Sequence, residues 1–273
     1  MDKPDNYPDI VYKYRSWKDK YHKKVLIDNE LYLASPKDFN DPFDLRIPID
    51  YSLLDSDQKI DTYVVDLIKQ GGTKLLEQYP NWDETKVFNY IKQDITEDLP
   101  KVQSDYEDRS YEQVDKHYGI LSMSERWDKI LMWSHYADKH FGYCVGFWEE
   151  KLRNSGICGN GGQVSYDPDN KFPRIDPMEK QEVKAIKQTH SKAYDWEYEN
   201  EYRLSKISWP DEFTDETRTC KVDDELFAEV IIGLRTTEQD RNEIISIAKQ
   251  KAIKVFQVVK VPWEFKIDRE EIE

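Results

Sequence analysis

Several kinds of protein are disfavoured by what this sequence has little of. No window approaches the roughly 20 apolar residues that span a bilayer, and the start, M-D-K-P-D-N-Y-P-D, lacks the apolar run of a signal peptide. Cysteine is scarce: the three residues are an odd number, widely spaced and without a C-x-x-C motif, which argues against a disulfide framework and a cysteine zinc site. We therefore expect a cytoplasmic protein that makes no membrane contact.

Positive charge is also in short supply. The chain carries 40 Lys and Arg against 55 Asp and Glu, a formal net charge of -15. A field of this sign repels phosphates, so we expect no non-specific binding to nucleic acid or to an anionic membrane. A small-molecule nucleotide is still a possible partner, because its binding requires only a local basic contact and not a positive net charge.

Common catalytic and metal-binding motifs are missing as well. The sequence has no P-loop, no G-x-G-x-x-G after a strand and no G-x-S-x-G elbow. The acids Asp38, Asp41 and Asp44 lack the glycine and the final glutamate of an EF-hand loop. His135 and His140 are five residues apart, which puts them about 140° apart around a helix rather than on one face. We therefore expect no bound metal.

Aromatic residues and charged residues are abundant. The 8 Trp, 18 Tyr and 10 Phe, within a hydrophobic content of 38%, can supply a sizeable core. The low mean hydropathy of -0.87 then reflects a charged surface rather than a missing core. A chain of 273 residues fits one large domain or two small ones.

The order of local patterns predicts an α+β fold. Strand-like strings flank a stretch of helical periodicity at about 56–118, and further helices are predicted at about Asp128–Lys139, over 177–190 and at 237–251. We expect a single domain over 1–273, with a mixed or antiparallel sheet of about eight strands and a helical insertion after the first two strands. The predicted strands are I-V-Y-K-Y-R (ending at Arg15), E-L-Y-L-A-S (Glu30 to Ser35), G-I-L-S-M-S, Y-C-V-G-F-W, Q-V-S-Y, W-E-Y-E-N-E-Y-R-L, A-E-V-I-I-G and K-V-F-Q-V-V-K-V.

The string W-E-Y-E-N-E-Y-R-L, residues 196–204, is the most informative feature. As a strand, it would place Glu197, Glu199, Glu201 and Arg203 on one face and the aromatic residues on the other, which suits a core. Neighbouring glutamates repel each other in a low-dielectric setting. Two interpretations remain open: a solvated edge face on which Arg203 pairs with Glu201, or a cleft of paired carboxylates with perturbed pKa values.

His135 and Tyr136 lie on a predicted helix that is apolar nearly all round. At least one of them is then expected to be buried and hydrogen-bonded. A hydrogen-bonded core histidine and a functional histidine are the two readings of His135.

Five strings together resemble a bacterial domain-of-unknown-function family, numbered 2971. They are Y-K-Y-R at Tyr12, L-Y-L-A-S-P-K-D-F-N-D-P-F-D at Leu31, L-M-W-S-H-Y-A-D-K-H-F-G-Y-C-V-G-F at Leu131, V-S-Y at Val164 and W-E-Y-E-N-E-Y-R at Trp196. Their order and spacing cover most of the chain. The resemblance implies no activity, since the family name records none.

A more distant resemblance is to ADP-ribosyltransferase-like domains, which bind NAD. It implies that Arg15 takes the position of the first-strand Arg or His, Ser35 or Tyr136 the second position, and Glu199 or Glu201 that of the glutamate. The chain has no clear S-T-S triplet, and E-N-E only loosely matches the E-x-E pair of that family. On this resemblance, Glu201, Glu199, Tyr136 and His135 are the candidate catalytic residues, and Arg15 and Ser35 the candidate cofactor-binding residues.

The function implied is an NAD-using ADP-ribosyltransferase or NAD glycohydrolase, in a toxin or phage-defence role and acting on a macromolecular target that the sequence does not identify. Cleavage of the nicotinamide–ribose bond passes through an oxocarbenium-like state that a preorganised carboxylate stabilises. The main alternative is a non-catalytic binding or sensor module. A metal-dependent hydrolase or nuclease using the acids and histidines is the third.

Overall fold

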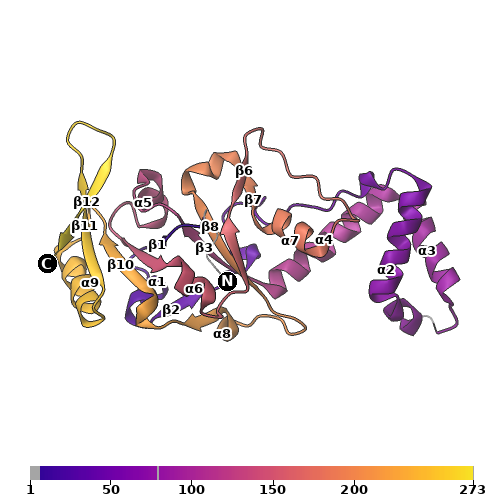
Figure 1. Ribbon diagram of the computed structural model, residues 1–273, viewed down its shortest axis with the longest axis horizontal. Coiled ribbons are helices and arrows are strands. Elements are labelled where there is room, and N and C mark those ends of the chain that lie inside the picture. Colours follow the sequence, from indigo (N-terminus) through magenta and orange to yellow (C-terminus); the bar gives the residue numbers. More distant parts are fainter. Residues whose placement is uncertain (1–6, 79, 273) are drawn as a thin grey trace. The chain divides into compact units, whose positions relative to one another are not determined.

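The computed structural model describes residues 7–78 and 80–272 (Figure 1). The chain divides into two compact units. Unit 1 comprises Met1–Pro42, Asp115–Asn170 and Lys192–Glu273, and unit 2 comprises Phe43–Val114 and Lys171–Ser191. Every helix within the described residues is too short or too polar to span a bilayer.

Unit 1 is built on an eight-stranded mixed sheet, which confirms the predicted α+β class. Its strand order is β12-β11-β10-β4-β1-β3-β8-β5, and all neighbouring strands are antiparallel except β10 and β11. The strands are β1 (Ile10–Arg15), β3 (Tyr118–Ser124), β4 (Tyr143–Trp148), β5 (Asn160–Gln163), β8 (Glu201–Ile207), β10 (Phe227–Ile232), β11 (Lys254–Lys260) and β12 (Ile267–Ile272).

The parallel pair β10 and β11 is joined by helix α9 (Glu238–Gln250), as a parallel connection requires a crossover. The Thr237 side chain caps this helix by accepting a hydrogen bond of 3.2 Å from the Asp240 backbone N–H. Figure 1 shows α9 beside these strands, at the end of the sheet that also carries the β11–β12 hairpin.

Helices cover both faces of the sheet. One core cluster contains buried residues of α1 (Lys20–Ile27), α6 (Glu149–Asn154) and α9, and the other contains Met132 and Trp133 of α5 (Ile130–Tyr136). Strand β1 feeds both clusters because its side chains alternate: Val11 lies in the first, and Tyr12 and Tyr14 lie in the second.

Short elements complete unit 1. Strands β2 and β9 form a small antiparallel sheet, and β6 and β7 form a second two-stranded sheet. These elements are β2 (Glu30–Tyr32), β9 (Thr219–Lys221), β6 (Ser165–Asp167), β7 (Ser191–Ala193), α8 (Asp215–Arg218) and the 3-10 helices η1 (Pro36–Asp38), η3 (Tyr194–Glu199) and η4 (Asp224–Leu226).

Unit 2 is the predicted helical insertion together with a later helix. Its core cluster is formed by Ile47, Ile49, Tyr51, Leu54, Ile60, Val64, Ile95 and Ile175. The helices are η2 (Tyr51–Leu53), α2 (Asp57–Gln78), α3 (Glu84–Glu97), α7 (Gln181–Thr189) and α4 (Leu99–His117), which continues into unit 1.

Several details of unit 1 differ from the sequence prediction. The predicted strand Q-V-S-Y is divided between β5, which ends at Gln163, and β6, which begins at Ser165 in a two-stranded sheet. The predicted helix Asp128–Lys139 spans only Ile130–Tyr136, because residues 138–140 all have positive φ. The predicted strand from Glu30 to Ser35 forms only β2, which lies in a two-stranded sheet rather than the large one. The eighth strand of the large sheet is β12, whose string I-D-R-E-E-I has too little alternation to predict a strand.

Candidate functional site

The candidate site lies where strands β1 and β3 diverge. Strand β1 pairs along all six residues with β4, but it pairs with β3 only at Tyr12 and Ser124. Farther along β3, the neighbour is not β1 but Ala34, which exchanges two backbone hydrogen bonds with Ile120 (2.8 and 2.9 Å). Between these two contacts, no strand among the described residues pairs with β3 on this side, so side chains can occupy the space.

Lys13 of β1 fills part of this interval. Its ammonium nitrogen donates a hydrogen bond to the Ser122 carbonyl. The pKa of Lys13 lies well below its ordinary value, mainly because of burial and secondarily because of Arg15, while Glu201 and Glu199 act in the opposite direction. A half-buried lysine beside two glutamates is therefore part of the site.

The acidic segment is not the continuous strand that its alternation predicts. Residues Tyr194–Glu199 form a 3-10 helix, Asn200 has a left-handed backbone (φ 43°), and strand β8 begins only at Glu201. The predicted glutamate face is therefore wrong in its first half: Glu197 is exposed, while Glu199 is buried on the 3-10 helix. The turn at Asn200 brings the side chains of Glu199 and Glu201 to one lysine.

Glu201 is a buried carboxylate held by two cations. Only 3% of it is exposed. Arg203 donates two hydrogen bonds of 2.8 Å, one to each of its oxygens, and Lys192 donates another of 3.0 Å. Burial alone would raise the pKa of Glu201, but Arg203 and Lys192 outweigh it and hold the pKa well below the ordinary value. Glu201 is therefore ionised at neutral pH.

Glu199 has the opposite electrostatic character. Its two oxygens accept hydrogen bonds from the Tyr136 hydroxyl (2.6 Å) and from Lys192 (2.5 Å), and 4% of the residue is exposed. Burial raises the pKa of Glu199, against the effect of Lys192 and Tyr136. The pKa of Tyr136 is also raised, first by burial and then by Glu199. The pKa of Glu199 is therefore raised while that of the neighbouring Glu201 is lowered.

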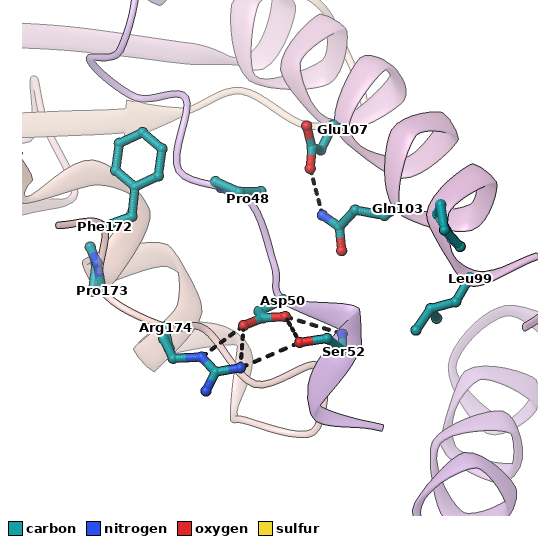
Figure 2. Close-up of a pocket in the computed structure, with 10 residues that line it drawn as sticks. Pro48, Asp50, Ser52, Leu99, Gln103, Glu107, Phe172, Pro173 and Arg174 are labelled. Atoms are coloured by element: carbon teal, nitrogen blue, oxygen red, sulfur yellow. Dashed lines mark hydrogen bonds and ion pairs between the residues drawn. The ribbon is translucent and has the colours of Figure 1, made fainter. Parts of the chain in front are cut away.

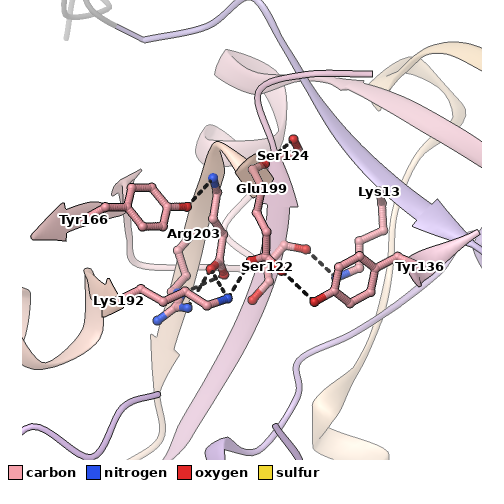
Figure 3. Close-up of polar contacts among 9 residues, drawn as sticks. Lys13, Ser122, Ser124, Tyr136, Tyr166, Lys192, Glu199 and Arg203 are labelled. Carbon is pink, nitrogen blue, oxygen red and sulfur yellow. Dashed lines mark hydrogen bonds and ion pairs between the residues drawn. The ribbon is translucent and has the colours of Figure 1, made fainter. Parts of the chain in front are cut away.

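Backbone contacts fix this arrangement, as Figure 3 shows. The Ser124 hydroxyl donates to the Glu199 carbonyl (2.6 Å), and the Glu201 backbone N–H donates to the Tyr166 hydroxyl oxygen (2.9 Å). Both acids are therefore anchored to strands β3 and β6 through main-chain atoms. We call Tyr136, Lys192, Glu199, Glu201 and Arg203 the Glu199–Glu201 network.

Partly exposed rings lie next to this network. The His135 and Tyr198 ring centroids are 6.1 Å apart, as are those of Trp196 and Tyr198, and the Lys192 ammonium lies 5.1 Å from the centre of the Trp196 ring. His135 is exposed, so the interpretation as a hydrogen-bonded core histidine is wrong; Tyr136 is the half-buried, hydrogen-bonded member of the pair. Such rings can stack on a planar ligand.

Besides His135, which has only ring contacts among the described residues, two predicted residues do not join the network. Arg15 lies on the same face of β1 as Lys13, donates to its own neighbour's carbonyl, that of Tyr14 (3.3 Å), and leaves its buried Nε without a partner. Ser35 is buried, and its hydroxyl donates to the Asp115 carbonyl (2.7 Å). The hydroxyl of Ser35 is thus engaged in a structural contact.

The sequence prediction did not include two lysines of the site. Lys13 stands in the alternating string of β1, where a lysine is usually solvent-facing, and Lys192 precedes the acidic segment by only a few residues. Local charge pairing along 192–203 was the one available signal for Lys192. Nothing local distinguishes Lys13, because the divergence of β1 from β3 is a tertiary feature.

Within residues 7–78 and 80–272, no group of three or more His, Cys, Asp and Glu residues has a geometry that could hold a metal ion. The network is instead made of carboxylates paired with ammonium, guanidinium and phenol groups.

Comparison with known proteins relates this part of the chain to one family. Residues 132–204 match the model described as Protein of unknown function (DUF2971). The match supports the family resemblance. It runs from α5 to β8 and so includes the whole Glu199–Glu201 network. No curated protein and no solved structure matches the chain significantly.

Proposed function

We propose that the protein binds NAD and breaks the bond between nicotinamide and ribose, either transferring ADP-ribose to an acceptor or hydrolysing NAD. The observation that carries this proposal is the pair of buried glutamates with opposite pKa shifts, next to partly exposed rings. Paired acids with separated pKa values are characteristic of acid–base and charge-stabilising sites.

In this proposal the two glutamates have different roles. When the carbon–nitrogen bond breaks, nicotinamide leaves as a neutral molecule with the bonding electron pair, and positive charge develops on the ribose. Glu201, held ionised by Arg203 and Lys192, would stabilise that charge. The water or acceptor that then adds to the ribose must lose a proton, and Glu199, with its raised pKa, is the candidate base.

The remaining residues of the site suit the rest of the ligand. Trp196, Tyr198 and His135 would stack on a planar ring. Lys13 and Arg15, two residues apart on one strand face, would bind phosphate oxygens. Neither of these two side chains forms an ion pair within the described part of the chain, and the buried Arg15 Nε has no hydrogen-bond partner there.

The experiment is incubation of the full chain with NAD, with and without cell lysate, followed by measurement of free nicotinamide and of protein-bound ADP-ribose. Glu201→Gln should lower nicotinamide release by about 100-fold or more, because it removes the charge but keeps the shape. Glu197→Gln, in the exposed part of the same segment, is the matched control and should retain activity. No turnover in either condition, together with no NAD binding by calorimetry, would refute the proposal.

A non-catalytic binding module is the second candidate, and one observation favours it. All four carboxylate oxygens of Glu199 and Glu201 already accept hydrogen bonds from the protein. A ligand that contacts them must displace an existing partner, which costs free energy. Binding of NAD without nicotinamide release would support this candidate. The cytoplasmic location and the toxin or phage-defence role stay predictions.

A further inference from the structure

Unit 2 contains a cavity of about 450 Å³ that the proposed function does not use. It lies between the segment before η2, the first turns of α4 and residues 172–174 (Figure 2). Its volume falls within the range of about 300–1,000 Å³ that is typical of small-molecule sites. The cavity is therefore large enough for a small organic ligand.

Much of the cavity wall is apolar. Pro48, Leu99, Pro100, Phe172 and Pro173 contribute to it. Phe172 is 48% exposed, and its ring centroid lies 6.4 Å from that of Phe43. Proline and phenylalanine rings present flat, rigid apolar surfaces, so the wall suits the apolar body of a ligand.

The cation of the cavity is already neutralised. Arg174 forms an ion pair of 2.7 Å with Asp50 and also donates to the Ser52 hydroxyl (3.3 Å). The Ser52 hydroxyl and, next, Arg174 hold the pKa of Asp50 below its ordinary value despite partial burial. Figure 2 shows these three side chains gathered at one side of the cavity. Arg174 is thus engaged and is a poor partner for an anionic ligand.

Glu107 is different, because it is positioned but has no cation. The Gln103 amide donates to one Glu107 oxygen (2.6 Å), and the same amide is anchored to the backbone through the Ile49 carbonyl (2.8 Å) and the Tyr51 N–H (3.0 Å). Within the described residues, no Lys, Arg or His forms an ion pair with Glu107. The ionisable residues of the lining therefore sum to one negative charge.

We propose that this cavity binds a small organic cation, with its ammonium group at Glu107 and its apolar body against the prolines and Phe172. Charge complementarity selects a cation, since Arg174, the one cationic side chain among the described lining residues, is paired with Asp50. The volume selects a small molecule rather than a polypeptide segment. The proposal is independent of NAD chemistry.

The test is a titration of the full chain with three probes that share a ring: 2-phenylethylamine, 2-phenylethanol and phenylacetate. Two-dimensional amide NMR measures the affinities and identifies the residues whose signals shift. The amine should bind about tenfold more tightly than the alcohol or the acid, because a charge-assisted hydrogen bond is about twice as strong as a neutral one. Signals of the lining residues should shift.

Two variants locate the ammonium group. Glu107→Gln should weaken amine binding about tenfold and leave the alcohol unaffected, since the substituted amide still accepts the Gln103 hydrogen bond. Glu97→Gln is the matched control, because Gln93 and Glu97 form the same Gln–Glu pair (2.7 Å) on exposed α3. Phenylacetate binding as tightly as the amine, shifts outside the lining, or full amine affinity in the Glu107→Gln variant would overturn the proposal.

Discussion

Two buried carboxylate networks of unit 1 contain the same kinds of side chain but differ in the number of acids and cations that are paired. In the second one, Glu229 of β10 accepts hydrogen bonds from the Tyr12 hydroxyl (3.0 Å) and from Arg269. Arg269 lies between the rings of Trp127 and Phe256, at 4.8 and 4.4 Å. We call Tyr12, Glu229 and Arg269 the Glu229 network; it has one acid and one cation, and it links β1, β10 and β12.

The Glu199–Glu201 network contains the same kinds of group, but it is not a single acid paired with a single cation. It has two acids with opposite pKa shifts, and the half-buried Lys13, which has no carboxylate partner among the described residues, lies beside it. Its tyrosine and its rings are partly exposed, whereas Tyr12 is buried. A buried tyrosine–glutamate pair is therefore common to both networks, and what distinguishes them is the partial exposure of Tyr136 and the opposite pKa shifts of the two acids.

The largest expected effect is on stability, from removal of the fully buried Arg203. Arg203→Met should lower the free energy of unfolding by about 3–5 kcal/mol, because it leaves Glu201 buried with one cation fewer. Arg269→Met should cost less, since the Arg269 side chain is 22% exposed and water can replace part of its contact. Urea unfolding measures both. Equal losses would contradict the difference between the networks.

The next effect separates stability from activity. Tyr136→Phe and Tyr12→Phe each remove a hydroxyl that donates to a buried carboxylate, so each should cost about 1.5–3 kcal/mol of stability. Only Tyr136→Phe should also lower NAD turnover, because only Glu199 is proposed to transfer a proton. Urea unfolding and nicotinamide release, measured on both variants, decide this. A similar loss of turnover in Tyr12→Phe would argue against the assignment.

A smaller effect is expected from the exposed rings. Trp196→Ala should raise KM for NAD about tenfold with little change in kcat, since stacking on one ring is worth roughly 1–3 kcal/mol. Glu197 is the adjacent exposed residue and serves as the control. Glu197→Gln should leave KM unchanged and should alter the free energy of unfolding by no more than about 0.5 kcal/mol. Steady-state kinetics of the two variants test this. An unchanged KM in Trp196→Ala would remove the ring surface from the proposed site.

The smallest effect is a change in pH dependence, predicted for Lys13. Because its folded-state pKa lies below its unfolded value, the unfolded chain binds more protons between these two pKa values, and wild-type stability should rise as the pH approaches 10.5. Lys13→Met should remove this contribution. The variant's stability relative to wild type should therefore fall as the pH rises toward 10.5, as measured by urea unfolding.

Lys254→Met is the control for that measurement, since the Lys254 side chain is 67% exposed. Parallel curves of stability against pH for wild type and Lys13→Met would show that Lys13 is not desolvated. The side chains that bond to Glu229 among residues 7–78 and 80–272 are Tyr12 and Arg269, so this pH dependence is predicted for the Glu199–Glu201 network and not for the Glu229 network.

Much of the fold could be predicted from the sequence where the signal is local. The apolar run of β4, the alternation of β1 and the capped helix α9 were all predicted and are confirmed, because each pattern is set by neighbouring residues. The missed β12 pairs along its length with β11 only, at the edge of the sheet. An edge strand with charged side chains has little hydrophobic periodicity to detect.

The candidate site was predicted only in part. Glu199, Glu201 and Tyr136 were chosen from the sequence and do lie in one hydrogen-bonded network. Arg15 and Ser35, chosen on the same grounds, make separate contacts. The alternation of aromatic and acidic residues from 196 to 204 led to the wrong prediction of one continuous strand. The same sequence pattern is compatible with the 3-10 helix, the turn at Asn200 and the strand that the structure has.

The sequence alone determined the α+β class, the position of the helical insertion and the candidate acids, because hydrophobic periodicity and residue type are local properties. Tertiary structure decided the rest. The pairing of Lys192 with two glutamates depends on the left-handed turn at Asn200, and the place of Lys13 depends on where β1 leaves β3. Burial and distance set the opposite pKa values of Glu199 and Glu201, and neither quantity exists until the chain is folded.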